Sequence, residues 1–147
     1  METATPQFDP VKYKNTTHDQ WQTAAEAWYR WSPTLNQWLG KATETMLEMA
    51  GISTGHRVLD VAAGAGEQSI TTAKKVGVTG YVLATDISSN ILEFAKQMAK
   101  QAGLENIETK VMDGENLTVP DSTFDAVISR VGLIYFPDQQ RALKEML

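Results

Sequence analysis

The chain has 147 residues, 42% of them hydrophobic and 21% charged, which suffices for one domain with a real core. Its net charge of −5, without any basic run, argues against a broad nucleic-acid surface, and the absence of cysteine excludes disulfides, thiol catalysis and Cys-ligated metals. Apolar runs are far shorter than a bilayer span and the N-terminus lacks a secretory pattern, so we expect a cytoplasmic protein that does not engage a membrane.

The N-terminal third predicts an irregular start followed by two helices. Residues 1–15 contain prolines and little periodicity, so we expect no regular structure there. Apolar residues then recur at three- and four-residue spacing over 17–31 and again over 33–50, which predicts two helices. Ser32 is expected to cap the second helix, with Pro33 at its first position and its apolar stripe turned inward.

From residue 52 onward, short apolar runs alternate with helical patterns, which is typical of parallel strands joined by right-handed crossovers. The sequence therefore predicts an α/β fold, with residues 1–51 as a helical cap and 52–147 as the sheet core. Strands are expected at 57–62, 81–87, 107–112 and 125–130, and helices at 67–76, 89–101 and 138–147.

The last predicted strand is apolar on both faces, as expected of a strand buried inside a parallel sheet. No later segment pairs beside it, and unpaired parallel edges invite association. Its outer edge is covered by the N-terminal helices or by a second copy in a homodimer, or the sequence is a piece of a longer protein. We favour the last of these interpretations.

The most informative stretch is Val58–Glu67, an apolar strand that ends in Asp60 and runs into a small-residue, glycine-containing turn. Asp86 ends the next apolar run, 20 residues after Gly66 (86 − 66). This layout indicates a nucleoside-binding βαβ unit, in which the turn admits a ligand and the second acid accepts ribose hydroxyls.

Two ligand types suit such a unit, a dinucleotide and S-adenosylmethionine, and charge distinguishes them. Asp60 before the turn and Glu67 at the helix start would repel a pyrophosphate but suit an ammonium and a sulfonium. The dinucleotide spacing also fails, because its third glycine would fall at Ser69. Glu67 is explained equally well by the preference for acids at helix starts.

Further candidates follow the second and third strands. Ile87 is expected to lie against adenine, and Asp113 to accept a hydrogen bond from the adenine amino group. Gly114 lets the backbone approach the ring closely. Three strands therefore end in acids at the carboxyl edge of the sheet, where open α/β folds bind ligands.

Residues 58–66, 84–88, 112–115 and 117–125 together resemble the motifs of class I S-adenosylmethionine-dependent methyltransferases, most closely the small-molecule, ubiquinone/menaquinone-biosynthesis-like group. Ala62 stands where the first motif usually has glycine. The resemblance implies a Rossmann-like sheet with strand order 3-2-1-4, the second half of the family's sheet being absent, and S-adenosylhomocysteine as product. Its implied cofactor contacts are Asp60, Ala62, Gly64, Gly66, Gln68, Asp86, Ile87, Met112, Asp113, Gly114, Glu115 and Arg130.

The implied reaction is an in-line displacement on a small-molecule acceptor, in which positioning and desolvation suffice, no metal is expected and a general base is optional. The catalytic residue is not identified; His18, Tyr13 and Tyr135 are candidates. Trp21 and Trp28 fit core packing or a lid over the cofactor. A non-catalytic binding or assembly module remains an alternative, as does a nicotinamide-dependent oxidoreductase, which the acids disfavour.

Overall fold

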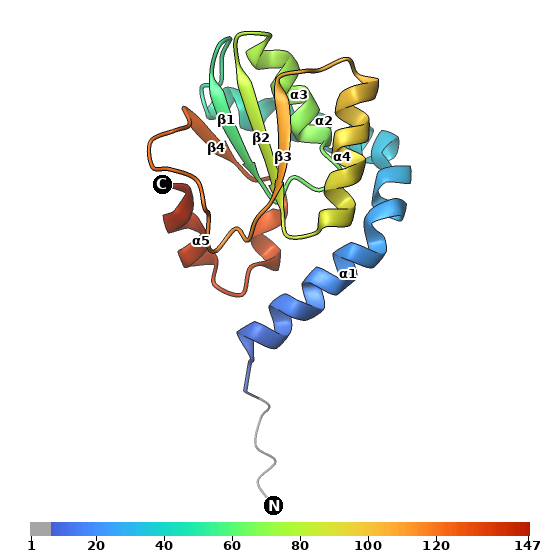
Figure 1. Ribbon diagram of the computed structural model, residues 1–147, viewed down its shortest axis with the longest axis vertical. Coiled ribbons are helices and arrows are strands. Elements are labelled where there is room, and N and C mark those ends of the chain that lie inside the picture. Colours follow the sequence, from blue (N-terminus) through green and yellow to red (C-terminus); the bar gives the residue numbers. More distant parts are fainter. Residues whose placement is uncertain (1–6) are drawn as a thin grey trace, which may run out of the picture.

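Four parallel strands in the order β3-β2-β1-β4 form the centre of the computed structural model, which describes residues 7–147 (Figure 1). The predicted α/β class and strand order are confirmed. The strands are β1 (Arg57–Val61), β2 (Tyr81–Asp86), β3 (Ile107–Val111) and β4 (Ala126–Ile128). The helices are α1 (Pro10–Arg30), α2 (Ser32–Met49), α3 (Glu67–Val76), α4 (Ser89–Gln101), the 3-10 turn η1 (Gly132–Tyr135) and α5 (Gln139–Met146).

The alternation of side chains along the strands gives the sheet two apolar faces. Val58 and Val82 pack with Leu47 of α2 and Val76 of α3 on one face. Leu59 and Leu83 face the other way, toward the segment 117–124 and α5. Figure 1 shows α2, α3 and α4 together on one side of the sheet, while α5 lies near the edge where the strands end and α1 runs from that edge along α4.

Helix α1 begins earlier than the sequence predicts. Pro10 occupies the first helical turn, and Asp9 Oδ1 accepts hydrogen bonds from the backbone N–H groups of Val11 and Lys12, both at 3.0 Å. The expectation of irregular structure over 1–15 is therefore wrong from Pro10 onward, because proline at a capped helix start favours the helix instead of breaking it. Residues 1–6 lie outside the described range.

Two expectations for α2 are also corrected. The helix is preceded by Trp31 without a side-chain cap, and Ser32 donates its hydroxyl hydrogen to the Glu67 carboxylate instead. The predicted apolar stripe does not coincide with the buried face of the helix: Trp38 and Met49 of the stripe are 77% and 85% exposed, whereas the buried Leu47 lies outside it. Helical spacing identifies a stripe but not the surface that covers it.

The fourth strand is shorter and less buried than predicted. Only Ile128 of β4 is fully buried, and Ala126 and Val127 are partly exposed. Within residues 7–147, no strand pairs with the outer edge of β4. No helix in this described part of the chain combines the length and apolarity needed to cross a bilayer.

Candidate functional site

A cavity opens at the carboxyl edge of the sheet, where β1, β2 and β3 end. The empty space within it, counted together with the open solvent at its mouth, is about 840 Å³. Ten of the twelve predicted cofactor residues line it: Ala62, Gly64, Gln68, Asp86, Ile87, Met112, Asp113, Gly114, Glu115 and Arg130. Asp60 and Gly66 do not.

The turn between β1 and α3 forms one wall of the cavity. Ala62, Gly64 and Gly66 all adopt left-handed backbone angles, with φ of 59°, 61° and 92°. For Ala62 this conformation costs about 1–2 kcal/mol. A Cβ atom at Gly132 would lie 2.5 Å from the Ala62 Cβ, so the Ala62 methyl group fits because residue 132 has no side chain.

Asp60 lies behind this wall. Its carboxylate is fully buried and accepts hydrogen bonds from Ser69 Oγ at 2.5 Å and Gln68 Nε2 at 3.3 Å. Burial raises the pKa of Asp60 to about 7, although these hydrogen bonds and Arg130 oppose the shift. The Asp60 side chain therefore fixes the start of α3 to the end of β1.

Asp86 reaches the cavity directly. Its Oδ2 accepts from the Gly64 N–H and its Oδ1 from the Ser88 N–H, both at 3.0 Å. Burial raises the pKa of Asp86, and the backbone hydrogen bonds oppose the shift. Each carboxylate oxygen accepts one hydrogen bond from these groups, so lone pairs remain for a ligand with two hydroxyls.

Lys14, which the sequence analysis missed, bridges the acids that follow β3. Its ammonium lies 2.7 Å from both Asp113 Oδ2 and Glu115 Oε2. Burial lowers the pKa of Lys14, but the two carboxylates outweigh burial and raise it overall. Glu115 Oε1 accepts in turn from the Asp138 N–H at 3.0 Å. The ion pair therefore ties the first turns of α1 to the wall expected to hold adenine.

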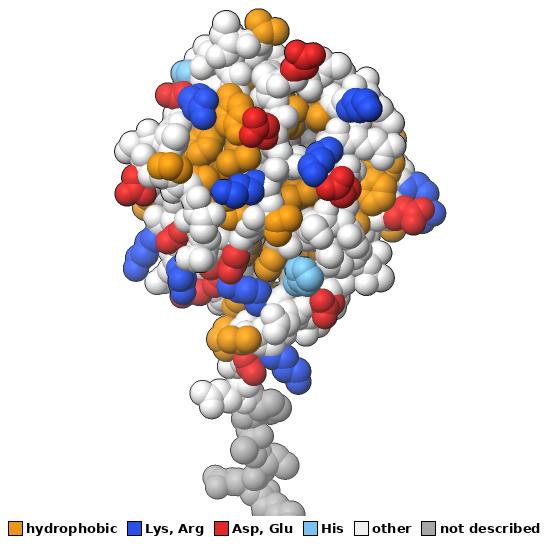
Figure 2. Space-filling model, viewed as in Figure 1, with side chains coloured by type: hydrophobic (Ala, Val, Ile, Leu, Met, Phe, Trp, Pro, Cys, Tyr) orange, Lys and Arg blue, Asp and Glu red, His pale blue; other side chains and the backbone are white. Residues whose placement is uncertain are grey.

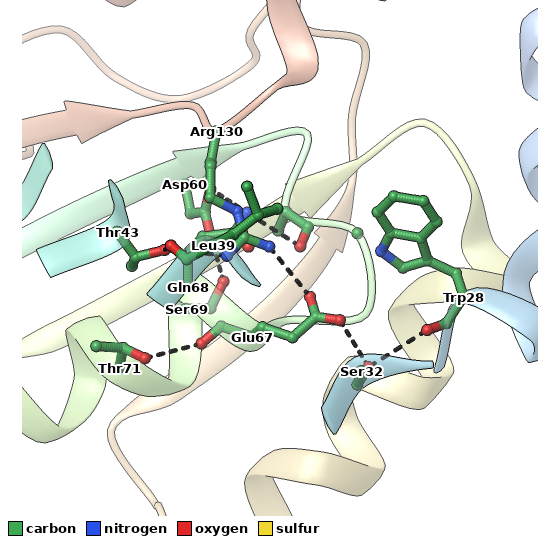
Figure 3. A network of polar contacts seen from close by, with 12 residues as sticks. Trp28, Ser32, Leu39, Thr43, Asp60, Glu67, Gln68, Ser69, Thr71 and Arg130 are labelled. Atoms are coloured by element: carbon green, nitrogen blue, oxygen red, sulfur yellow. Dashed lines mark hydrogen bonds and ion pairs between the residues drawn. The ribbon is translucent and has the colours of Figure 1, made fainter. Parts of the chain in front are cut away.

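Arg130 and Glu67 meet at the other end of the cavity (Figure 3). Arg130 Nη1 donates to Thr43 Oγ1 at 3.0 Å, and Nη2 lies 3.6 Å from Glu67 Oε2. Desolvation by burial lowers the pKa of Arg130, and the negative charges of Glu67 and Asp60 offset this shift only in part. Three buried atoms of this cluster, Arg130 Nε, Gln68 Oε1 and Glu67 Oε2, make no hydrogen bond to any residue of the described range.

An aromatic wall closes the cavity opposite the sheet. Trp21 makes edge-on contacts with Trp28 and Tyr135, at centroid distances of 5.1 and 5.3 Å. All three rings line the cavity, whereas the other catalytic candidates, Tyr13 and His18, do not. His18 Nδ1 contacts the exposed carboxylate of its neighbour Asp19 at 3.0 Å. Among residues 7–147, no three His, Cys, Asp or Glu side chains are grouped to hold a metal. On the face drawn in Figure 2, acidic and basic side chains are interspersed, with hydrophobic side chains between them.

Curated relatives of this chain include methyltransferases named for ubiquinone and menaquinone biosynthesis. It is 36% identical over 102 residues to the ubiquinone/menaquinone biosynthesis C-methyltransferase of Pseudomonas fluorescens, covering 69% of this chain and 40% of that protein. The chain is also 36% identical to the demethylmenaquinone methyltransferase of Listeria welshimeri, and this match covers 70% of this chain and 43% of that protein. The chain thus spans about two fifths of the length of these relatives.

Solved structures with the same fold carry different activities. The YcgJ protein of Bacillus subtilis matches with a TM-score of 0.66 and 27% identity, covering 72% of this chain and 44% of that one. An arsenic(III) S-adenosylmethionine methyltransferase from Chlamydomonas reinhardtii matches with a TM-score of 0.60 and 33% identity, covering 65% of this chain and 35% of that one. A [4+2]-cyclase, SpnF, matches with a TM-score of 0.67 and 21% identity, covering 85% of this chain and 54% of that one. The fold alone therefore does not define the reaction.

A family model described as a methyltransferase domain matches residues 58–147, which include β1 to β4 and every predicted cofactor contact. The chain therefore belongs to the class I S-adenosylmethionine-dependent methyltransferase family.

Proposed function

We propose that this chain binds S-adenosylmethionine in the cavity and supplies the cofactor-binding half of a methyltransferase that acts on a small molecule. The observation that carries the proposal is the occupant of the α3 N-terminus. A dinucleotide would place its pyrophosphate there, but Glu67, the first residue of α3, carries a buried carboxylate that would repel it. The same site tolerates a cationic ligand.

The cavity fits the three parts of this cofactor. Asp86 retains acceptor capacity for the ribose hydroxyls, and Ile87 and Met112 offer apolar surface to adenine. Gly114 is required at the adenine end, because a Cβ there would lie 2.5 Å from Phe136 Cζ. The unpartnered Gln68 Oε1 and Arg130 Nε match the ammonium and carboxylate of the methionine part.

Bound cofactor supplies a methyl group on a positively charged sulfur, which is already activated for transfer. The residues of the chain orient it and exclude water: Trp21, Trp28 and Tyr135 form an apolar wall against which an acceptor ring can pack. Tyr135 is the candidate general base within the cavity. The quinone-pathway relatives make an aromatic ring carbon the acceptor atom that we propose to test first.

We also propose that α1 acts as a lid. Residues Lys14, Thr17, Trp21 and Trp28 of α1 reach the cavity, whereas the rest of the lining comes from the sheet core and the segment after β4. Such a lid would open for exchange and close to exclude water. We further propose that the outer edge of β4 pairs with additional strands of a longer sheet or with a second copy of the chain.

Calorimetric titration with S-adenosylmethionine, S-adenosylhomocysteine and a nicotinamide dinucleotide tests the proposal. We expect the two adenosyl compounds to bind and the dinucleotide not to bind. Asp86→Asn should weaken binding of both adenosyl compounds, because the amide group replaces one ribose acceptor. Preferential binding of the dinucleotide would refute the proposal, and methylation of a panel of phenols and quinols would show whether binding leads to turnover. The mass of the protein in solution tests the homodimer.

A further inference from the structure

Four polar side chains from three segments meet under the methionine end of the cavity (Figure 3). Glu67 starts α3, Ser32 starts α2, Thr43 lies in the second half of α2, and Arg130 follows β4. Their contacts run in a chain, because Ser32 Oγ donates to Glu67 Oε1 at 2.6 Å, Glu67 Oε2 faces Arg130 Nη2, and Nη1 donates to Thr43.

This chain of contacts fixes a charge that would be costly to bury alone. The Arg130 side chain is 9% exposed and that of Glu67 is fully buried. A buried cation is stable only with an opposing charge and hydrogen-bond acceptors, and Glu67 and Thr43 provide them. Glu67 is itself stabilised by Ser32 and by the N-terminus of α3. The guanidinium therefore has little freedom to turn.

One edge of that guanidinium is left free. Nε is buried and unpartnered within the described chain, and Arg130 lines the cavity. Guanidinium N–H groups pair with carboxylates through parallel hydrogen bonds, provided that the guanidinium plane is held in the right orientation. An oriented Arg130 is thus suited to an anionic group entering from the cavity.

We propose that Glu67 is a positioning residue, which together with Ser32 and Thr43 holds Arg130 so that Arg130 receives the carboxylate of the ligand's amino-acid tail. This inference rests on the proposed function. It replaces the prediction from sequence that the Glu67 carboxylate itself faces the ligand's ammonium.

Two ligand fragments separate these alternatives. Decarboxylated S-adenosylmethionine keeps the ammonium and loses the carboxylate, and 5′-methylthioadenosine loses both. If Glu67 acts through Arg130, Glu67→Gln weakens the binding of S-adenosylmethionine about tenfold or more and changes the affinity for the decarboxylated compound by no more than about twofold. If Glu67 binds the ammonium, the affinities for both compounds fall equally. In either case 5′-methylthioadenosine is unaffected.

The experiment is calorimetric titration of these three ligands into wild type, Glu67→Gln, Arg130→Met and the double variant. We expect both single variants to lose the preference of wild type for S-adenosylmethionine over its decarboxylated form. The double variant should lose no more affinity for S-adenosylmethionine than Arg130→Met does. Thr71→Val is the matched control, because Thr71 Oγ1 bonds the Glu67 backbone oxygen instead of its carboxylate. Thermal unfolding of each variant checks that it folds.

Ser32→Ala and Thr43→Val repeat the test should Glu67→Gln not fold, and we expect the same ligand preference to shrink in both. Equal losses for S-adenosylmethionine and its decarboxylated form in these variants would overturn the inference. So would a wild type that binds both forms equally well. A wild type that binds none of the three ligands would instead refute the proposed function.

Discussion

Replacing Asp60 with asparagine should change how the stability of the protein depends on pH. The pKa of Asp60 is raised to about 7 in the folded chain, whereas an unfolded Asp titrates near its ordinary value of about 3.9. Between these values the folded state binds one proton more than the unfolded state. Stability therefore falls as pH rises from about 4 through 7, and the Asp60→Asn substitution removes this dependence.

The magnitude follows from the distance to the folded pKa. At pH 5 the group is two units below a pKa of about 7, and at pH 8 the folded-state proton is lost. Two units correspond to about 2.7 kcal/mol, so wild type should lose on the order of 2 to 3 kcal/mol relative to Asp60→Asn between pH 5 and pH 8. Gln68 can turn its unpartnered Oε1 toward the new amide, which keeps the site satisfied.

Urea unfolding of both proteins at pH 5, 6, 7 and 8 measures the difference. The comparison cancels the contributions of the other carboxylates, because both proteins carry them. Asp121→Asn, at an exposed position, is the control and should track wild type. A difference between wild type and Asp60→Asn that stays constant within about 0.5 kcal/mol across this range would show that burial does not perturb Asp60.

Three further substitutions test the walls of the cavity. Gly114→Ala places a methyl group 2.5 Å from Phe136 Cζ, so it should destabilise the fold by about 1–3 kcal/mol and weaken adenosyl-ligand binding, as seen by thermal unfolding and calorimetry. Ala62→Gly relieves a left-handed alanine and should raise the free energy of unfolding by up to about 1 kcal/mol in urea, and a lowered value would contradict the strain argument. Lys14→Met leaves the buried Glu115 without its cation, so stability should fall by about 1 kcal/mol or more, whereas Lys12→Met, at an exposed neighbour, should not change it.

Local signals in the sequence predicted the elements that form the site. The helices at 67–76 and 89–101 were predicted with their observed limits, because Gly77 and Gly103 stop them and Ser88 caps the second. Strand order followed from the family resemblance, and parallel pairing placed the acidic strand ends at one edge. Ten of the twelve predicted cofactor positions consequently fall around one cavity.

Long-range contacts were not predictable in the same way. Lys14 lies 99 residues before Asp113, and Ser32 lies 35 residues before Glu67, so no periodicity connects either pair. Lys14 also falls in a stretch predicted to be irregular, which hid its place on a helix face. Burial could not be predicted from the sequence either, and in the structure Asp60 is fully buried and does not line the cavity.

These contacts change the electrostatic argument for a cationic ligand. Counting acids along the strand ends suggests a strongly negative cradle, but two of the carboxylates share Lys14 and a third faces Arg130. Asp60 is buried with a pKa of about 7 and adds at most part of a charge. What remains is Asp86 at the centre of the cavity, between a cation at each end. Under the proposed function, we expect such a site to select less by total charge than by order along its length, with acceptors for a ribose in the middle and Arg130 held where an amino-acid carboxylate would lie.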